Sequence, residues 1–154
     1  MAIVFDCSVT LAWFLQDERT GFTDTAFELL ETAECWVPYL WRLEFPNALL
    51  MAERKRRVGR EQRLEILDSA AQLFLRTDPT LPDIRTLGAL ADRRGLTVYD
   101  ASYLELAARS GFDLITLDRA LADAASAEGV AVHAPGRSSA AQVRKRYGVL
   151  PTHA

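Results

Sequence analysis

Long apolar runs are missing from this sequence of 154 residues. No uninterrupted apolar stretch approaches the roughly 18 residues that a membrane-spanning helix needs. No basic leader precedes the short apolar run from Met1 to Phe5, as it would in a secretory signal. We therefore expect neither membrane insertion nor secretion, and we place the protein in the cytoplasm.

Cysteine and histidine are scarce. Cys7 and Cys35 lie far apart, and neither has a Cys-x-x-Cys partner. His133 and His153 are too few and too isolated to build a zinc site. The sequence thus excludes a structural zinc site, and we expect both cysteines to be small buried hydrophobic residues.

A surplus of positive charge is also lacking, because 18 Lys and Arg stand against 21 Asp and Glu, for a net charge of −3. Proteins that bind nucleic-acid phosphates usually draw on such a surplus. If four acids lie in one metal-neutralised site, however, 17 acidic residues remain against 18 basic ones, and the rest of the surface is about neutral. Net charge therefore does not exclude an RNA partner.

The sequence does contain enough apolar residues for a folded domain, at 49% hydrophobic and 25% charged. A chain of this length fits one domain, which we assign to residues 1–135. From Gly136 the sequence turns polar and small and then basic, so we predict a poorly packed C-terminal extension over residues 136–154.

Strand and helix patterns alternate along the chain. Apolar runs predict short strands at residues 1–5, 35–37, 113–117 and 130–132, and apolar residues at helical spacing predict the helices between them. The region from about Trp41 to Leu75, interrupted at Val58-Gly59, is predicted to be a helical hairpin with an apolar stripe of Leu64, Leu67, Ala71 and Phe74 in its second half. Alternating strands and helices are typical of an α/β fold with a parallel sheet.

Acidic residues occupy positions where such sheets bind ligands, beyond the carboxyl ends of the strands. Asp6 and Asp118 each follow a predicted strand and precede a helix, and Asp100 opens a helix of its own. Each residue alone is well explained as a helix N-cap. If they gather, carboxylates repel one another unless a cation such as Mg²⁺ or Mn²⁺ neutralises them, so a cluster implies a metal.

Glu44 is a fourth candidate. It interrupts an otherwise apolar helical stretch, and a buried glutamate needs a partner or a metal, although a solvated position is the alternative. Pro46 complicates its placement, because proline inside a helix removes a backbone donor and is expected to kink or restart the helix.

Four segments resemble the PIN domain and, more narrowly, VapC-type toxins. They occur in the family's order and at similar spacing, and the resemblance covers about residues 2 to 133. The segments are Ile3-Val-Phe-Asp-Cys-Ser-Val-Thr-Leu-Ala-Trp-Phe14, Leu43-Glu-Phe-Pro-Asn-Ala-Leu49, Leu96-Thr-Val-Tyr-Asp-Ala-Ser-Tyr-Leu104 and Leu114-Ile-Thr-Leu-Asp-Arg119.

The resemblance implies a three-layer sandwich, with a central, mostly parallel sheet flanked by helices, and a magnesium- or manganese-dependent endoribonuclease. Its acidic quartet maps onto Asp6, Glu44, Asp100 and Asp118, with either one or two metal ions. It also implies a type II toxin that pairs with an antitoxin protein and forms a homodimer. Ser8 and Thr116 match hydroxyl positions that could orient a carboxylate, a water or a phosphate.

Two alternatives to the nuclease function fit the sequence less well. A phosphatase or phospho-acceptor of similar topology needs an acidic pair that Asp6-Cys-Ser8 does not supply. A non-catalytic PIN-like module that binds RNA or protein is disfavoured by the presence of all four acids. The basic run, which includes Arg54, Lys55, Arg56 and Arg57, is predicted either to contact RNA phosphates or to be a solvated hairpin end.

Overall fold

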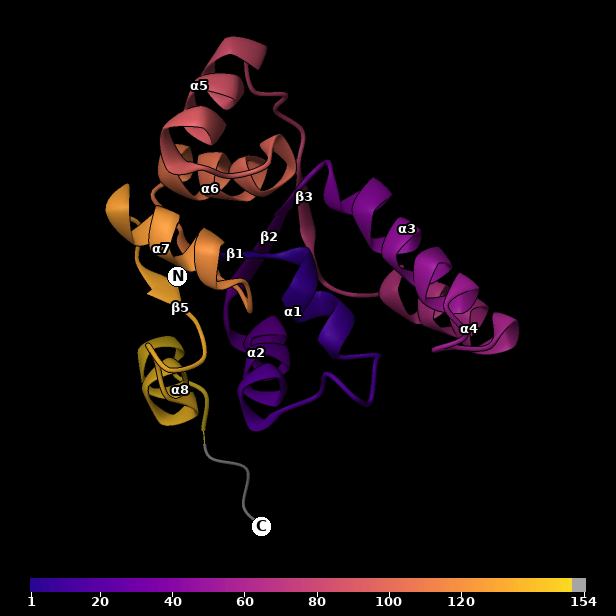
Figure 1. The fold of residues 1–154 in the computed structure, drawn as a ribbon. Coiled ribbons are helices and arrows are strands. Elements are labelled where there is room, and N and C mark those ends of the chain that lie inside the picture. Colours follow the sequence, from indigo (N-terminus) through magenta and orange to yellow (C-terminus); the bar gives the residue numbers. More distant parts are fainter. Residues whose placement is uncertain (151–154) are drawn as a thin grey trace.

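Five parallel strands form one sheet in the computed structural model, which describes residues 1–150 (Figure 1). The strand order is β3-β2-β1-β4-β5, and each neighbouring pair within these residues is parallel. The strands are β1 (Ala2–Phe5), β2 (Glu34–Pro38), β3 (Arg76–Asp78), β4 (Asp113–Ile115) and β5 (Val132–His133). The predicted α/β class with a central parallel sheet is confirmed.

Helices cover both faces of the sheet, so the fold has three layers (Figure 1). One face carries α5 (Ile84–Arg94), α6 (Val98–Ser110) and α7 (Arg119–Ala127). The other carries α1 (Cys7–Ala12), α2 (Gly21–Thr32) and α8 (Ala140–Tyr147). A hairpin of α3 (Trp41–Arg54) and α4 (Arg60–Ala70) projects to one side. Within residues 1–150, no helix is both long and apolar enough to cross a membrane.

The central strand β1 is apolar along its whole length because helices cover both of its faces. Ile3, Val4 and Phe5 are fully buried, as expected for the middle of a parallel sheet. Ile3 pairs with Cys35 on one side and with Asp113 on the other. Cys7 and Cys35 are both buried free thiols, as predicted.

The strand order reverses direction at β1. From β1 the chain first adds β2 and then β3 on one side, and later returns to add β4 and β5 on the other. The chain leaves β1 toward α1 on one face of the sheet and leaves β4 toward α7 on the other, and a ligand-binding crevice is expected beyond the carboxyl ends of two such strands. Asp6 follows β1, and Thr116 and Asp118 follow β4.

The predicted helical hairpin is present, but two details differ from the sequence-based expectation. Helix α3 continues through Pro46 without restarting, at the loss of the one N–H that proline lacks. Helix α4 ends at Ala70, so Phe74 lies beyond it and is 84% exposed. The buried residues of α4 are Ile66 and Ala70, so the packed face of the helix differs from the predicted stripe, whose Leu64 is 45% exposed.

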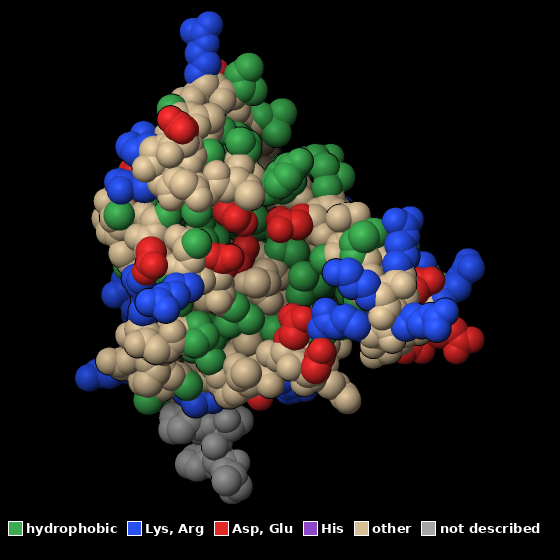
Figure 2. All heavy atoms as spheres, viewed as in Figure 1, with side chains coloured by type: hydrophobic (Ala, Val, Ile, Leu, Met, Phe, Trp, Pro, Cys, Tyr) green, Lys and Arg blue, Asp and Glu red, His purple; other side chains and the backbone are tan. Residues whose placement is uncertain are grey.

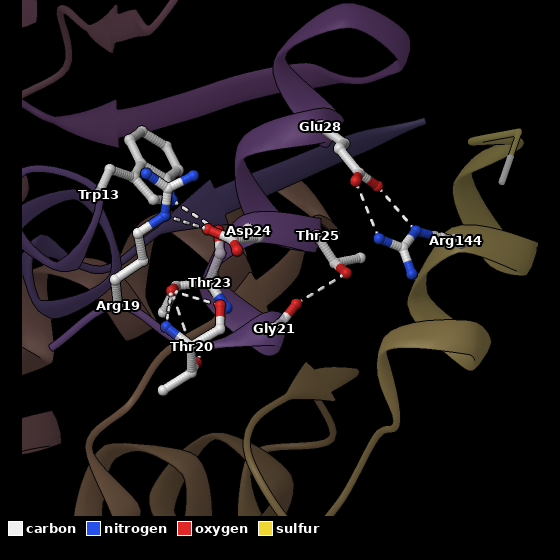
Figure 3. A network of polar contacts seen from close by, with 9 residues as sticks. All are labelled: Trp13, Arg19, Thr20, Gly21, Thr23, Asp24, Thr25, Glu28 and Arg144. Carbon is white, nitrogen blue, oxygen red and sulfur yellow. Dashed lines mark hydrogen bonds and ion pairs between the residues drawn. The ribbon is translucent and has the colours of Figure 1, made fainter. Parts of the chain in front are cut away.

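The expectation of a poorly packed tail does not describe residues 140–147, which form α8. Val143 and Tyr147 are buried, and Arg144 makes two bonds of 2.7 and 2.8 Å to the carboxylate of Glu28 on α2 (Figure 3). Residues 151–154 of the tail lie outside the described residues.

A second anchor of α8 is the buried carboxylate of Asp113 at the start of β4. It accepts hydrogen bonds from Tyr147 at 2.7 Å and from Arg146 at 2.6 and 2.9 Å, and it lies 2.8 Å from the ring Nε2 of His133. Burial alone would raise the pKa of Asp113, but Arg146, Tyr147 and His133 outweigh it and hold the pKa below its ordinary value. The carboxylate thus ties α8 to β4 and, through His133, to the edge strand β5.

Candidate functional site

Asp6 stands at the carboxyl end of β1 with its side chain almost completely buried, at 4% exposed. Its N–H donates to the carbonyl of Ile115, which fixes its backbone against β4. Its Oδ2 accepts hydrogen bonds from the hydroxyls of Ser8 and of Thr116, the latter at 2.7 Å. Among the described residues, Oδ1 accepts no side-chain hydrogen bond, so it is the oxygen left for a ligand.

The same two hydroxyls connect Asp6 to the turn after β4. Ser8 Oγ accepts the N–H of Leu117 at 3.1 Å, and Thr116 Oγ1 accepts the N–H of Asp118 at 2.9 Å. Each hydroxyl therefore donates to a carboxylate and accepts from the backbone, an arrangement that fixes its orientation. Both predicted hydroxyl positions lie beside Asp6.

Glu44 lies in the first turn of α3 and is half-buried, and the helix continues past Pro46. Its Oε2 accepts a hydrogen bond of 2.8 Å from the phenol of Tyr103 on α6. Burial raises the pKa of Glu44, the Tyr103 bond opposes that shift, and the charges of Asp6 and Asp100 add to it.

Asp100 is in the first turn of α6, where Thr97 caps the helix by accepting the Asp100 N–H at 3.1 Å. Its charge raises the pKa values of both Asp6 and Glu44. For Asp6 the larger cause is burial, which the bonds from Ser8 and Thr116 partly offset. Acidic side chains gather near the middle of the face where α6, α7, β1 and the start of α3 meet (Figure 2). Asp6, Glu44 and Asp100 therefore lie near enough for their charges to interact.

Asp118 is placed differently from the other three acids. It is the N-cap of α7, and its Oδ1 accepts the N–H of Leu121 at 2.8 Å. The capping function that its position allowed is thus present. Its side chain is exposed, and Oδ2 accepts no hydrogen bond from the described residues. One of its oxygens therefore remains available at the same edge of the sheet.

Carboxylate oxygens are suitable ligands for a hard divalent cation, although these side chains do not form a preformed coordination shell. Within residues 1–150, no three acidic, histidine or cysteine side chains are close enough together to enclose a metal ion. Mg²⁺ usually keeps several waters and uses only one or two protein carboxylates, so it does not need such a cage. Burial is the largest cause of the raised pKa values of Asp6 and Glu44, and the charge of Asp100 adds to both shifts. A bound cation would offset that repulsion. The residues fit the predicted ion.

Tyr103 is a site residue that the sequence did not single out. Its phenol bonds Glu44, which is 59 positions away in the chain. The available signal was its spacing, because Tyr103 lies three residues after Asp100 on a helix and hence on a neighbouring part of the same face.

The basic run lies at the tip of the α3–α4 hairpin, where Lys and Arg side chains project at the side of the molecule (Figure 2). Arg57 is held there by Asp17 and Glu18 at 2.8 and 2.7 Å. Arg54, Lys55 and Arg56 are exposed and make no ion pair within residues 1–150. Of the four predicted RNA-contact residues, Arg57 is therefore in ion pairs, whereas the other three make none within residues 1–150.

Comparisons with known proteins agree with this fold. The family model described as the PIN domain matches residues 3–127. Ribonuclease VapC3 of Pyrobaculum aerophilum is 30% identical over 125 residues, which are 80% of this chain and 94% of that protein. The crystal structure of PAE2754 from the same organism has a TM-score of 0.60 at 25% identity and covers 86% of this chain and 83% of its own.

A likeness in fold alone extends to VapBC2 of Rickettsia felis, solved with a DNA fragment from their promoter. The TM-score is 0.64 at 13% identity, covering 87% of this chain and 98% of that one. Together these matches confirm the predicted three-layer, PIN-like architecture.

Proposed function

This chain belongs to the PIN domain family, and from that premise we propose that it is a divalent-metal-dependent endoribonuclease, the toxin of a type II toxin–antitoxin pair. The name of the relative Ribonuclease VapC3 supports the class of reaction. What supports the proposal is that Asp6, Glu44 and Asp100, from three separate elements, lie near enough for their charges to interact, next to the reversal of strand order between β1 and β4. Repelling carboxylates in such a place are best explained by a cation.

Mg²⁺ or Mn²⁺ is the proposed cofactor, held by Asp6, Glu44, Asp100 and the open oxygen of Asp118. When bound, such an ion supplies an acidified water and offsets the negative charge that develops on the scissile phosphate. The chain's own contribution is orientation, since the hydroxyls of Ser8 and Thr116 fix one oxygen of Asp6 and leave the other facing the crevice. Attack of water on phosphorus would break the bond to the 3′-oxygen, leaving a 5′-phosphate and a 3′-hydroxyl.

The substrate we propose is RNA, because the α3–α4 tip offers cations on one side of the acidic crevice. Arg54, Lys55 and Arg56 are free to contact phosphates, which attract such side chains irrespective of base sequence. Arg57 contributes less, because it is already paired with Asp17 and Glu18.

A protein partner is proposed as well, in the form of an antitoxin that covers the site, together with a homodimer. Exposed apolar side chains on and next to the hairpin support an interface, namely Leu43, Leu64 and Phe74. A groove of about 290 Å³ also runs between α3 and the segment that follows α4, lined by residues that include Phe45 and Leu73. Such a pair is expected to act in the cytoplasm, where the RNA is.

The test of this proposal is cleavage of a mixed tRNA and rRNA pool by purified, partner-free protein with Mg²⁺ or Mn²⁺. An EDTA control and the Asp100→Asn variant are run beside it. Asp92→Asn is the matched control, because Asp92 is an exposed aspartate on the neighbouring helix α5. Metal-dependent cleavage that Asp100→Asn loses and Asp92→Asn keeps would support the nuclease.

Cleavage that survives EDTA and Asp100→Asn would overturn the proposed mechanism. Absence of both cleavage and Mn²⁺ binding by the wild-type protein would favour the non-catalytic, partner-binding alternative.

A further inference from the structure

We propose that Tyr103 is a positioning residue for Glu44, holding one carboxylate oxygen so that the other is presented to the metal. The inference rests on the proposed metal-dependent function. The sequence resemblance suggests that Ser8 and Thr116 orient site groups through their hydroxyls. We assign the same role to the buried phenol of Tyr103.

The geometry of Tyr103 suits this purpose. Its side chain is 0% exposed, and its ring is packed in the core beneath α6. The phenol emerges from that core to donate a 2.8 Å hydrogen bond to Glu44 Oε2. Among residues 1–150, no other side chain donates to Glu44. Its orientation therefore depends on this single bond.

The carboxylate of Asp6 is also held through one oxygen, but by two hydroxyls instead of a phenol. Its Oδ2 is held by the hydroxyls of Ser8 and Thr116, whereas its Oδ1 accepts no side-chain hydrogen bond. Glu44 likewise has Oε2 held and Oε1 open. In both cases one oxygen is fixed by hydroxyl donors and the second is left as a ligand. Such outer donors orient metal-binding groups and commonly govern affinity.

A tyrosine is a strong support because packing fixes its ring. Glu44 has several rotatable bonds and is only half-buried, so without a donor it can swing toward solvent. A core tyrosine cannot follow it, since close packing leaves its ring little room. The phenol therefore selects one rotamer of Glu44 before any ligand arrives, which lowers the entropy cost of binding.

Substitution of Tyr103 by Phe removes only the hydroxyl and keeps the ring in place. We expect Tyr103→Phe to bind Mn²⁺ about 10–100-fold more weakly than wild type, as for other residues that orient metal ligands. Free Mn²⁺ is measured by electron paramagnetic resonance during titration of the full-length protein. Tyr99→Phe is the matched control, because Tyr99 lies on the same helix but is 64% exposed, and we expect no change.

A double-mutant cycle separates positioning from a general structural effect. If Tyr103 acts through Glu44, then Tyr103→Phe should cause little further loss of Mn²⁺ affinity in a Glu44→Gln background. Unchanged affinity of the single Tyr103→Phe variant would overturn the inference. So would an equal loss in both backgrounds, since Tyr103 would then act independently of Glu44.

Different experimental outcomes would overturn the positioning inference and the proposed function. Wild-type protein that neither binds Mn²⁺ nor cleaves RNA would overturn the nuclease proposal and the inference together. Normal Mn²⁺ binding and cleavage by wild type, with an unaffected Tyr103→Phe, would overturn the positioning inference alone.

Discussion

Replacing Asp113 by Asn should loosen α8 from the sheet without changing the acidic crevice. Asn matches Asp in size, so no cavity forms, but the negative charge that Tyr147, Arg146 and His133 share is lost. Hydrogen bonds to charged groups contribute about 1.5–3 kcal/mol each. The side chain of Arg146 is 45% exposed, so its share is discounted for solvent screening.

Counting mainly the buried Tyr147 and His133, and allowing the amide oxygen to keep one bond, we expect a loss of about 2–4 kcal/mol in unfolding free energy. That loss corresponds to a fall in Tm of roughly 5–12 °C for a domain of this size.

Urea unfolding, followed by tryptophan fluorescence, measures the loss, and amide hydrogen exchange locates it in α8. Asp123→Asn is the control, because Asp123 forms an exposed ion pair with Arg137. A loss below about 0.5 kcal/mol, which is typical of surface substitutions, or unchanged protection of α8 amides, would refute the anchoring function of Asp113.

The difference in unfolding free energy between wild type and Asp113→Asn should also depend on pH, in a direction that follows from the pKa of Asp113. The pKa of Asp113 is held below its ordinary value of 3.8 in the folded protein, so its charged form stabilises the fold at neutral pH. This contribution is present above the unfolded pKa and is lost as pH falls through the folded value. Wild type and Asp113→Asn should therefore converge in stability only in acid, below about pH 4.

Three further predictions concern the crevice and the hairpin tip. Asp100→Asn should abolish metal-dependent cleavage yet raise the metal-free unfolding free energy by about 0.5–2 kcal/mol in thermal melts, because it relieves repulsion; a destabilised variant would contradict this account. Mn²⁺ affinity measured by titration should fall as pH drops, because the raised pKa values of Asp6 and Glu44 let protons compete with the ion; a flat profile from pH 8 to 5 would count against these ligands. Arg54→Ala should reduce the salt dependence of RNA binding by about one counterion, and Arg57→Ala by less, because Arg57 is already paired; equal slopes would remove the distinction.

Most of the fold was predictable because the apolar runs are local signals. The strands at β1, β2 and β4 and the helical hairpin were all located, although β5 begins two residues later than the predicted 130–132. Strand β3 was missed, since Arg76-Thr77-Asp78 has no apolar run and lies at the edge of the sheet. Helix α8 was not foreseen as packed, because its anchors Glu28 and Asp113 are distant in sequence.

The acidic site residues were also predictable in part from local signals in the sequence. Strand ends and helix starts mark where acids can approach one another, and, beside the larger effect of burial, the charge of Asp100 raises the pKa values of Asp6 and Glu44. The sequence offered helix capping as an alternative for Asp118, which does use one oxygen as a cap, but it did not reveal that Tyr103 holds Glu44. That contact depends on side-chain directions that only the packed fold determines.

The reversal of strand order at β1 also bears on how the chain is synthesised. On the ribosome, β1 is made first, but its partner β4 and the Thr116 hydroxyl that fixes Asp6 come more than 100 residues later. Contacts so distant in sequence form late, and domains fold as units once enough chain is available. An unfinished chain that ends before β4 lacks Thr116 and Asp118. If the proposed function holds, the nascent chain would therefore leave the surrounding RNA intact until most of its length has been translated.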